Sequence, residues 1–140
     1  MLRASCCLVL VAIVGCRMAE REGMNPLPEN GAPLSFDEML SRARGQAASA
    51  LDAYYIDAWL ELEQAGQRLE QSARLLPKST HIPENLKTKV EPESNLLRQD
   101  ARKLVEAARN RNSTEANAIM QRINERIRLL RPTANSEDKK

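Results

Sequence analysis

Apolar and small side chains recur every three or four residues through much of this 140-residue chain, which is the spacing of one face of an α-helix. The first such stripe runs from Phe36 to Leu76 and stops before Pro77, which cannot continue a helix. Ser35 and Glu38 have the spacing of a capping box, in which the two side chains bond each other's backbone N–H groups. The pattern therefore predicts that helical structure begins at Ser35.

The first stripe is long enough for either one helix or two. A single helix about 60 Å long would extend past any partner in the chain and leave apolar surface bare. Residues 54–56 (YYI) are weak helix formers, and Asp57 is a residue type that favours helix caps. The sequence thus favours two helices, at about 35–54 and 57–76, with Asp57 capping the second.

A loop containing three prolines is expected at residues 77–92. The third helix is predicted at about 93–111, with Pro92 in its first turn, where a missing N–H costs nothing.

The last apolar stripe predicts a fourth helix at about 113–131. Asn112 or Ser113 is suited to cap its start, and Pro132 ends it. The polar tail at 133–140 is expected to be disordered.

Each predicted helix has a single apolar face, so the helices must pack against one another. We expect an all-α fold, an antiparallel bundle of three to four helices spanning residues 35–132. Aromatic residues make up only 3% of the chain, which argues against a β-domain. Trp59 is the largest apolar side chain and is expected to lie within the core.

The amino terminus has a different pattern. Arg3 precedes an apolar run from Ala4 to Val14, which is typical of a secretory signal and too short to span a bilayer. We predict a signal peptide at residues 1–15.

The segment Ile13-Val14-Gly15-Cys16 resembles the lipobox of bacterial prolipoproteins. The resemblance implies that the Cys16 thiol is linked to a diacylglycerol and that the chain is cut before Cys16. Residues 16–34 are rich in Pro and Gly and are predicted to form a flexible tether. The alternative is an ordinary secretory signal with an incidental cysteine.

The implied location is the cell envelope, with a lipid anchor in the inner or outer membrane and the protein facing the periplasm or the exterior. The chain has a formal net charge of only +2, so it lacks the strongly basic character of a nucleic-acid-binding domain. Its oligomeric state is left open.

Few residues suggest catalysis or metal binding. His81 is the only histidine, and with Glu84 alone nearby it provides too few ligands for zinc. The carboxylates Asp57, Glu61 and Glu63 are interpreted as a solvated face rather than an acid/base pair. We therefore expect no enzyme activity, no metal site and no cofactor.

Four arginines, Arg122, Arg126, Arg128 and Arg131, lie on the last predicted helix and just beyond it. One hypothesis is a basic strip that binds anionic lipid headgroups or an acidic partner. The favoured interpretation is complementary charge between helices of the bundle.

Several packing positions resemble those of the cytochrome c-prime type of bundle: Trp59, Leu62, Ala65, Leu69, Leu97, Ala101 and Leu104. The segments at 57–63, 69–74 and 121–124 are also similar to uncharacterised helical proteins exported by planctomycete-type bacteria. Those cytochromes attach haem through Cys-x-x-Cys-His in the last helix, but this chain has IRLLR at 127–131. Covalent haem is therefore not expected.

The sequence favours a non-enzymatic envelope lipoprotein that has a structural role or binds another protein. The alternative is a bundle that holds a cofactor or small ligand non-covalently between its helices. Met39 or Met120 could then ligate a haem, although the chain offers no second ligand.

Overall fold

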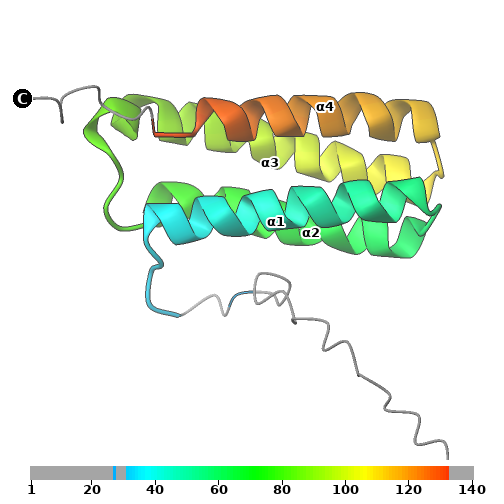
Figure 1. Cartoon of the computed structure of the whole chain (residues 1–140), viewed down its shortest axis with the longest axis horizontal. Helices are drawn as coiled ribbons and strands as arrows, with labels where there is room; N and C mark the ends of the chain where they lie inside the picture. The colour runs from blue at the N-terminus through cyan, green and yellow to red at the C-terminus, as the bar shows by residue number, and fades with distance from the viewer. Residues whose placement is uncertain (1–26, 28–30, 133–140) are drawn as a thin grey trace, which may run out of the picture.

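The computed structural model describes Leu27 and residues 31–132, and these form four α-helices (Figure 1). The helices are α1 (Phe36–Tyr55), α2 (Trp59–Leu75), α3 (Lys87–Arg109) and α4 (Ser113–Leu129). Two short 3₁₀ helices, η1 (Leu76–Lys78) and η2 (Glu84–Leu86), lie between α2 and α3. The predicted signal peptide, Cys16 and the predicted tail at 133–140 lie outside the described residues.

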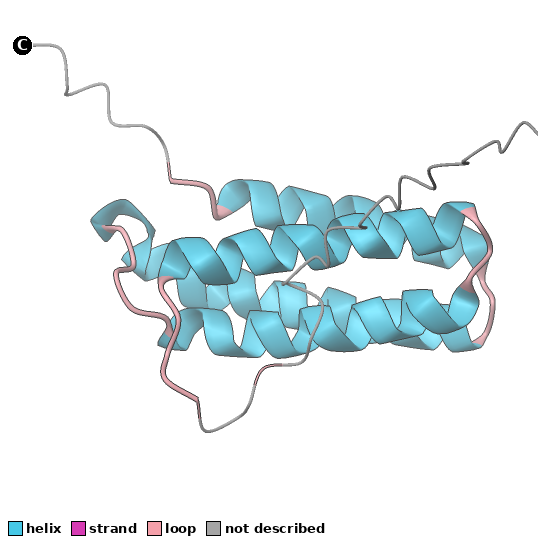
Figure 2. Ribbon diagram, turned by 60° about the horizontal axis from the view of Figure 1, so that its bottom comes forward, coloured by secondary structure: helices cyan, strands magenta, loops and turns pink. Residues whose placement is uncertain are grey.

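Successive helices run antiparallel and surround one core (Figures 1 and 2). α2 packs against α1 and α3, α3 packs against α4, and α4 returns to α1. The predicted all-α bundle is confirmed, with four helices. We call the end that holds the α1–α2 and α3–α4 turns the turn end, and the opposite end, where α1 begins and α4 ends, the terminal end.

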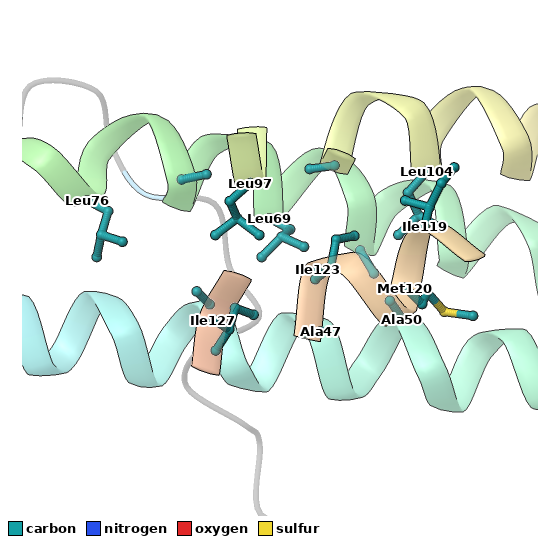
Figure 3. Close-up of a cluster of buried hydrophobic side chains, with 14 of the residues drawn as sticks. Ala47, Ala50, Leu69, Leu76, Leu97, Leu104, Ile119, Met120, Ile123 and Ile127 are labelled. Carbon is teal, nitrogen blue, oxygen red and sulfur yellow. The ribbon is translucent and has the colours of Figure 1, made fainter. Parts of the chain in front are cut away.

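The core consists mainly of aliphatic side chains that recur on the inward face of each helix, together with Phe36 at the start of α1. Leu69 of α2, Leu97 and Leu104 of α3 and Ile123 of α4 are fully buried among them (Figure 3). The middle of α1 instead contributes mainly alanine, at positions 43, 47, 50 and 53. These small side chains leave room for the larger residues of the neighbouring helices.

The turn between α1 and α2 is closed by backbone hydrogen bonds. Asp57 has a left-handed conformation, with φ of 56°. Its N–H donates to the carbonyl of Tyr54 at 3.2 Å, and the N–H of Ala58 donates to that of Ala53 at 2.9 Å. This is the Schellman pattern of a helix end. The break between two helices is confirmed, but Asp57 terminates α1 rather than capping α2, whose N-cap is Ala58 and has no side-chain hydrogen bond.

The α3–α4 turn repeats this pattern. Arg111 has φ of 49°. Its N–H donates to the carbonyl of Ala108 at 3.0 Å, and the N–H of Asn112 donates to that of Ala107 at 2.9 Å. The Asn112 side chain then caps α4 by accepting the N–H of Glu115 at 3.1 Å. Asn112, one of the two predicted caps, therefore ends one motif and begins the next.

The left-handed backbone at Arg111 gives a test of this turn. A side chain there costs about 1–2 kcal/mol that glycine avoids, offset in part by the greater entropy of an unfolded glycine. We expect Arg111→Gly to raise the free energy of unfolding by about 1 kcal/mol, measured by urea denaturation. The control is Asn110→Gly, because Asn110 has an ordinary φ of −83° and the substitution should give no gain. Equal effects of the two would contradict this account.

Helix α3 begins earlier than predicted. It starts at Lys87, whereas the predicted start is about residue 93. Pro92 is therefore the sixth residue of α3 and does not lie in its first turn. A proline here removes one hydrogen bond, the one that would reach the carbonyl of Thr88. Leu86 and Val90 are both buried in the core, and their burial offsets this loss. Burial in the folded chain thus overrides the local proline signal.

The start of α1 agrees with the sequence. The Glu38 N–H donates to Ser35 Oγ at 3.3 Å, and the Ser35 N–H donates to Glu38 Oε2 at 2.9 Å, which confirms the capping box. Hydrogen bonds from the Ser35 side chain and backbone lower the pKa of Glu38 below its ordinary value of 4.5. This cap therefore contributes stability at neutral pH and loses it as the pH falls through that lowered pKa.

Part of the predicted tether at 16–34 is docked on the bundle. The Leu27 N–H donates to Gln71 Oε1 at 3.0 Å, and Gln71 Nε2 donates back to the Leu27 carbonyl at 2.8 Å. The Thr80 N–H donates to the Leu34 carbonyl at 2.9 Å, and both leucines pack against the core. The prediction of a flexible tether at 16–34 is therefore wrong for Leu27 and Leu34, because both bury apolar surface.

Trp59 lies at the edge of the core and not within it. It is the first residue of α2, half-buried at the turn end, with its ring edge-on to Tyr54 at a centroid distance of 6.3 Å. Its spacing from Leu62 matches the apolar stripe, but the bundle ends there and leaves one side of the indole uncovered.

Candidate functional site

Two of the four arginines in the hypothesised basic strip form ion pairs within the bundle. Arg122 Nε lies 3.0 Å from Asp100 Oδ1, and Arg126 Nη1 lies 3.3 Å from Glu93 Oε2. Both carboxylates belong to α3, so these pairs join α4 to α3. For Arg122 and Arg126 the structure supports the favoured interpretation, complementary charge between helices.

The other two arginines are exposed. Arg128 lies near the end of α4 and Arg131 follows that helix, both at the terminal end. Neither has an ion pair within the part of the chain that the structure describes. Lys78 of η1 is also exposed at this end. Among the described residues, the exposed cations at this end thus include Arg128 and Arg131 of the predicted strip and Lys78 from another element.

The three carboxylates considered for acid/base chemistry do not form a site together. Glu63 Oε1 accepts from Arg109 Nε at 2.8 Å, which joins α2 to α3. Asp57 is exposed in the α1–α2 turn, and Glu61 is exposed on α2. Two of the three carboxylates are thus exposed to solvent and the third is ion-paired, whereas an acid/base pair needs a pocket that both groups share.

His81 lies in the loop between α2 and α3, where it is exposed and has a left-handed φ of 58°. Its Nδ1 is 3.1 Å from the hydroxyl of the neighbouring Thr80. Across Leu27 and residues 31–132, no three His, Cys, Asp or Glu side chains are grouped so that they could hold a metal ion.

The methionines proposed as haem ligands are core residues. Met39 and Met120 are both buried among aliphatic side chains of the hydrophobic core. Met39 also borders a cavity of about 280 Å³ at the terminal end, between the docked N-terminal segment and the ends of α1 and α2. Its lining includes Leu27, Pro33, Leu34, Leu75 and Lys78. This volume is just below the usual range of about 300–1,000 Å³ for small-molecule sites.

A cluster of exposed apolar side chains lies at the turn end, where the sequence pattern predicts only a break between two helices. Tyr55, Ile56 and Leu60 are 75%, 75% and 63% exposed. We call these three residues the turn patch. Residues 54–56 were interpreted only as weak helix formers. The available signal was that aromatic and β-branched residues stood where a turn normally carries polar ones.

No protein-family model, curated protein or solved structure matches this chain. The structure therefore defines a class, the antiparallel four-helix bundle, and this class hosts many unrelated functions. A function has to be argued from the residues themselves.

Proposed function

We propose that this chain is a non-enzymatic lipoprotein of the bacterial envelope, anchored through a lipid on Cys16, whose bundle binds another protein or has a structural role. The observation that carries the proposal is the lipobox-like Ile13-Val14-Gly15-Cys16 directly after an apolar run of signal-peptide length. A diacylglycerol supplies two acyl chains, and two chains give stable anchoring where one gives only marginal binding.

The docking of Leu27 supports this proposal. Ten residues, 17–26, separate Cys16 from Leu27, and a chain of this length reaches at most about 40 Å. Gln71, which holds Leu27, lies one turn before the end of α2 at the terminal end. A lipid on Cys16 would therefore keep the terminal end of the bundle within about 40 Å of the membrane.

The exposed cations at the terminal end also support it. Arg128, Arg131 and Lys78 are exposed at the end of the bundle that the anchor would hold near the bilayer. Basic side chains near an anionic leaflet contribute about 1 kcal/mol each to membrane association. Among the described residues, no helix is long and apolar enough to cross a membrane. In this proposal, association depends on the lipid with help from these charges.

A binding or structural role is better supported than catalysis or cofactor binding. The carboxylates considered as acid and base are either ion-paired or separately exposed. The described inward positions of the four helices carry mainly Leu, Ile, Ala and Met, which pack against one another. A cofactor held between the helices, the alternative function, would have to displace this packing.

Replacing Cys16 by alanine tests the proposal. We expect Cys16→Ala to abolish labelling of the protein by radioactive palmitate in cells and to leave an uncut or soluble form. Labelling and membrane fractionation of an exported, epitope-tagged full chain are the measurements. The matched control is Cys7→Ala, which lies within the apolar run and should keep the label. Undiminished labelling of Cys16→Ala would overturn the proposal.

A further inference from the structure

The turn patch is an apolar surface concentrated in one six-residue segment. Tyr55 is the last residue of α1, Ile56 follows it, and Leu60 is the second residue of α2. The half-buried Trp59 lies inside the same segment, so the partly covered indole extends the apolar surface. In the described part of the chain, the other exposed large apolar residues are Leu96 on α3 and Leu129 on α4, and such single residues are normal on a protein surface.

The turn patch is flanked by negative charge. Asp57 separates Ile56 from Ala58 in the turn, and Glu61 follows Leu60, and both carboxylates are exposed. Arg109, the last residue of α3, is already paired with Glu63, whereas Arg111 in the α3–α4 turn is exposed at the same end of the bundle. The segment 55–61 itself carries two exposed carboxylates and no basic side chain, and these two carboxylates form the acidic border of the apolar centre.

We propose that the turn patch binds a partner protein through a basic surface with an apolar centre, such as one face of an amphipathic helix flanked by Lys and Arg. The apolar side chains supply the buried contact, and the acidic border selects the charge of the partner. A second copy of this chain would bring its own acidic border against this one, which costs energy. An anionic membrane is repelled for the same reason.

The position of the turn patch in the bundle suits this role. Helix α1 has 20 residues, so the turn patch lies about 30 Å from the start of α1. The docked N-terminal segment reaches the bundle at the opposite, terminal end (Figure 1). The biological meaning of the inference rests on the proposed function, in which a lipid holds the terminal end near the membrane and the turn end projects away.

Trp59 provides a direct reporter for the test. It is the only tryptophan in the chain and lies beside the turn patch. The probe is an 18-residue amphipathic helix made only of Leu and Lys, compared with a peptide that has Glu in place of every Lys. Both are titrated into the full chain carrying Cys16→Ala, so that the result does not depend on lipidation. We expect the Lys peptide to shift Trp59 emission to shorter wavelength and the Glu peptide to leave it unchanged.

Two sets of variants separate the apolar and the charged contribution. Ile56→Ser with Leu60→Ser should weaken binding of the Lys peptide at least tenfold, because it removes two of the apolar side chains that supply the contact. Both side chains are exposed, so their loss leaves the core intact. The matched control Leu129→Ser removes a 48% exposed leucine at the terminal end and should leave binding unchanged. Asp57→Asn with Glu61→Gln removes two negative charges and should therefore reduce the affinity and its dependence on salt. The turn should be kept, because asparagine also tolerates the left-handed conformation.

Four results would overturn the proposal. Equal binding of the Glu peptide would remove the charge argument, and equal weakening by Leu129→Ser would remove the location. A dimer in analytical ultracentrifugation that Ile56→Ser disperses would make a second copy the occupant. If phosphatidylcholine vesicles shift Trp59 emission and Ile56→Ser abolishes this shift, the occupant of the turn patch is a lipid bilayer.

Discussion

Replacing Gly66 by leucine is expected to lower the free energy of unfolding by about 3 kcal/mol, because α2 and α3 have no space for a side chain at this position. A Cβ on Gly66 would lie 2.9 Å from Val105 Cγ2 and 3.4 Å from the Ala101 carbonyl oxygen. Valine is stiff about χ1, and the carbonyl belongs to the α3 backbone, so neither moves aside easily. The larger side chain has to push the two helices apart.

Gly45 provides the matched control. It is also a glycine inside a helix, but a Cβ there would meet nothing within 4 Å. Alanine restricts the unfolded chain and suits a helix better, so Gly45→Ala should raise the free energy of unfolding by about 1 kcal/mol. Urea denaturation of both variants is the measurement.

A double-mutant cycle identifies the contact responsible. Gly66→Ala alone is expected to lose stability, whereas in a Val105→Ala background the same change should be neutral or favourable, because the 2.9 Å contact is gone. If Gly66→Leu keeps the stability of the parent, or if Val105→Ala leaves the effect of Gly66→Ala unchanged, the close approach of α2 and α3 is not what fixes glycine here.

These two glycines illustrate how far the sequence predicts this fold. Local signals worked where the structure they specify is local: the capping box at Ser35 and the break after Tyr55 are both present. Gly45 and Gly66 have the same local meaning, a weak point in a helix, and only the packing of α3 distinguishes them. Pro92 failed as a boundary for a related reason, since tertiary burial of the preceding residues extends α3 through it.

The candidate surfaces were harder to predict than the fold. Spacing placed Arg122 and Arg126 one turn apart on the polar side of a helix, but it could not show that α3 presents Asp100 and Glu93 opposite them. Charge complementarity across helices depends on their relative rotation, which no single stripe encodes. The turn patch was missed because exposure at a turn depends on whether another element covers it.

Replacing Arg122 by alanine is expected to lower mainly the stability of the bundle, whereas replacing Arg128 is expected to lower mainly its binding to anionic vesicles. Asp100 is buried, with its side chain only 9% exposed, and Arg122 is its partner at 3.0 Å. Arg122→Ala leaves this carboxylate without a counter-ion, and we expect a loss of about 2 kcal/mol in urea denaturation, reduced from the fully buried case because Arg122 itself reaches solvent. Arg128→Ala should change stability by less than about 0.5 kcal/mol.

Binding to vesicles containing anionic phosphatidylglycerol should show the reverse order. Arg128→Ala is expected to weaken binding about fivefold, the equivalent of roughly 1 kcal/mol for one basic side chain near the surface, and Arg131→Ala should add a similar factor. Arg122→Ala, measured where it is still folded, should have little effect because its charge is already paired. In the double variant with Asp100→Ala, part of the stability lost in Arg122→Ala should return, since no buried charge is left unpaired. An equal fall in vesicle binding for Arg122→Ala and Arg128→Ala would contradict the division into paired and exposed arginines. Ion pairing within the bundle would then not remove a charge from the membrane-binding surface, and the four arginines would act as a single strip that binds an anionic partner.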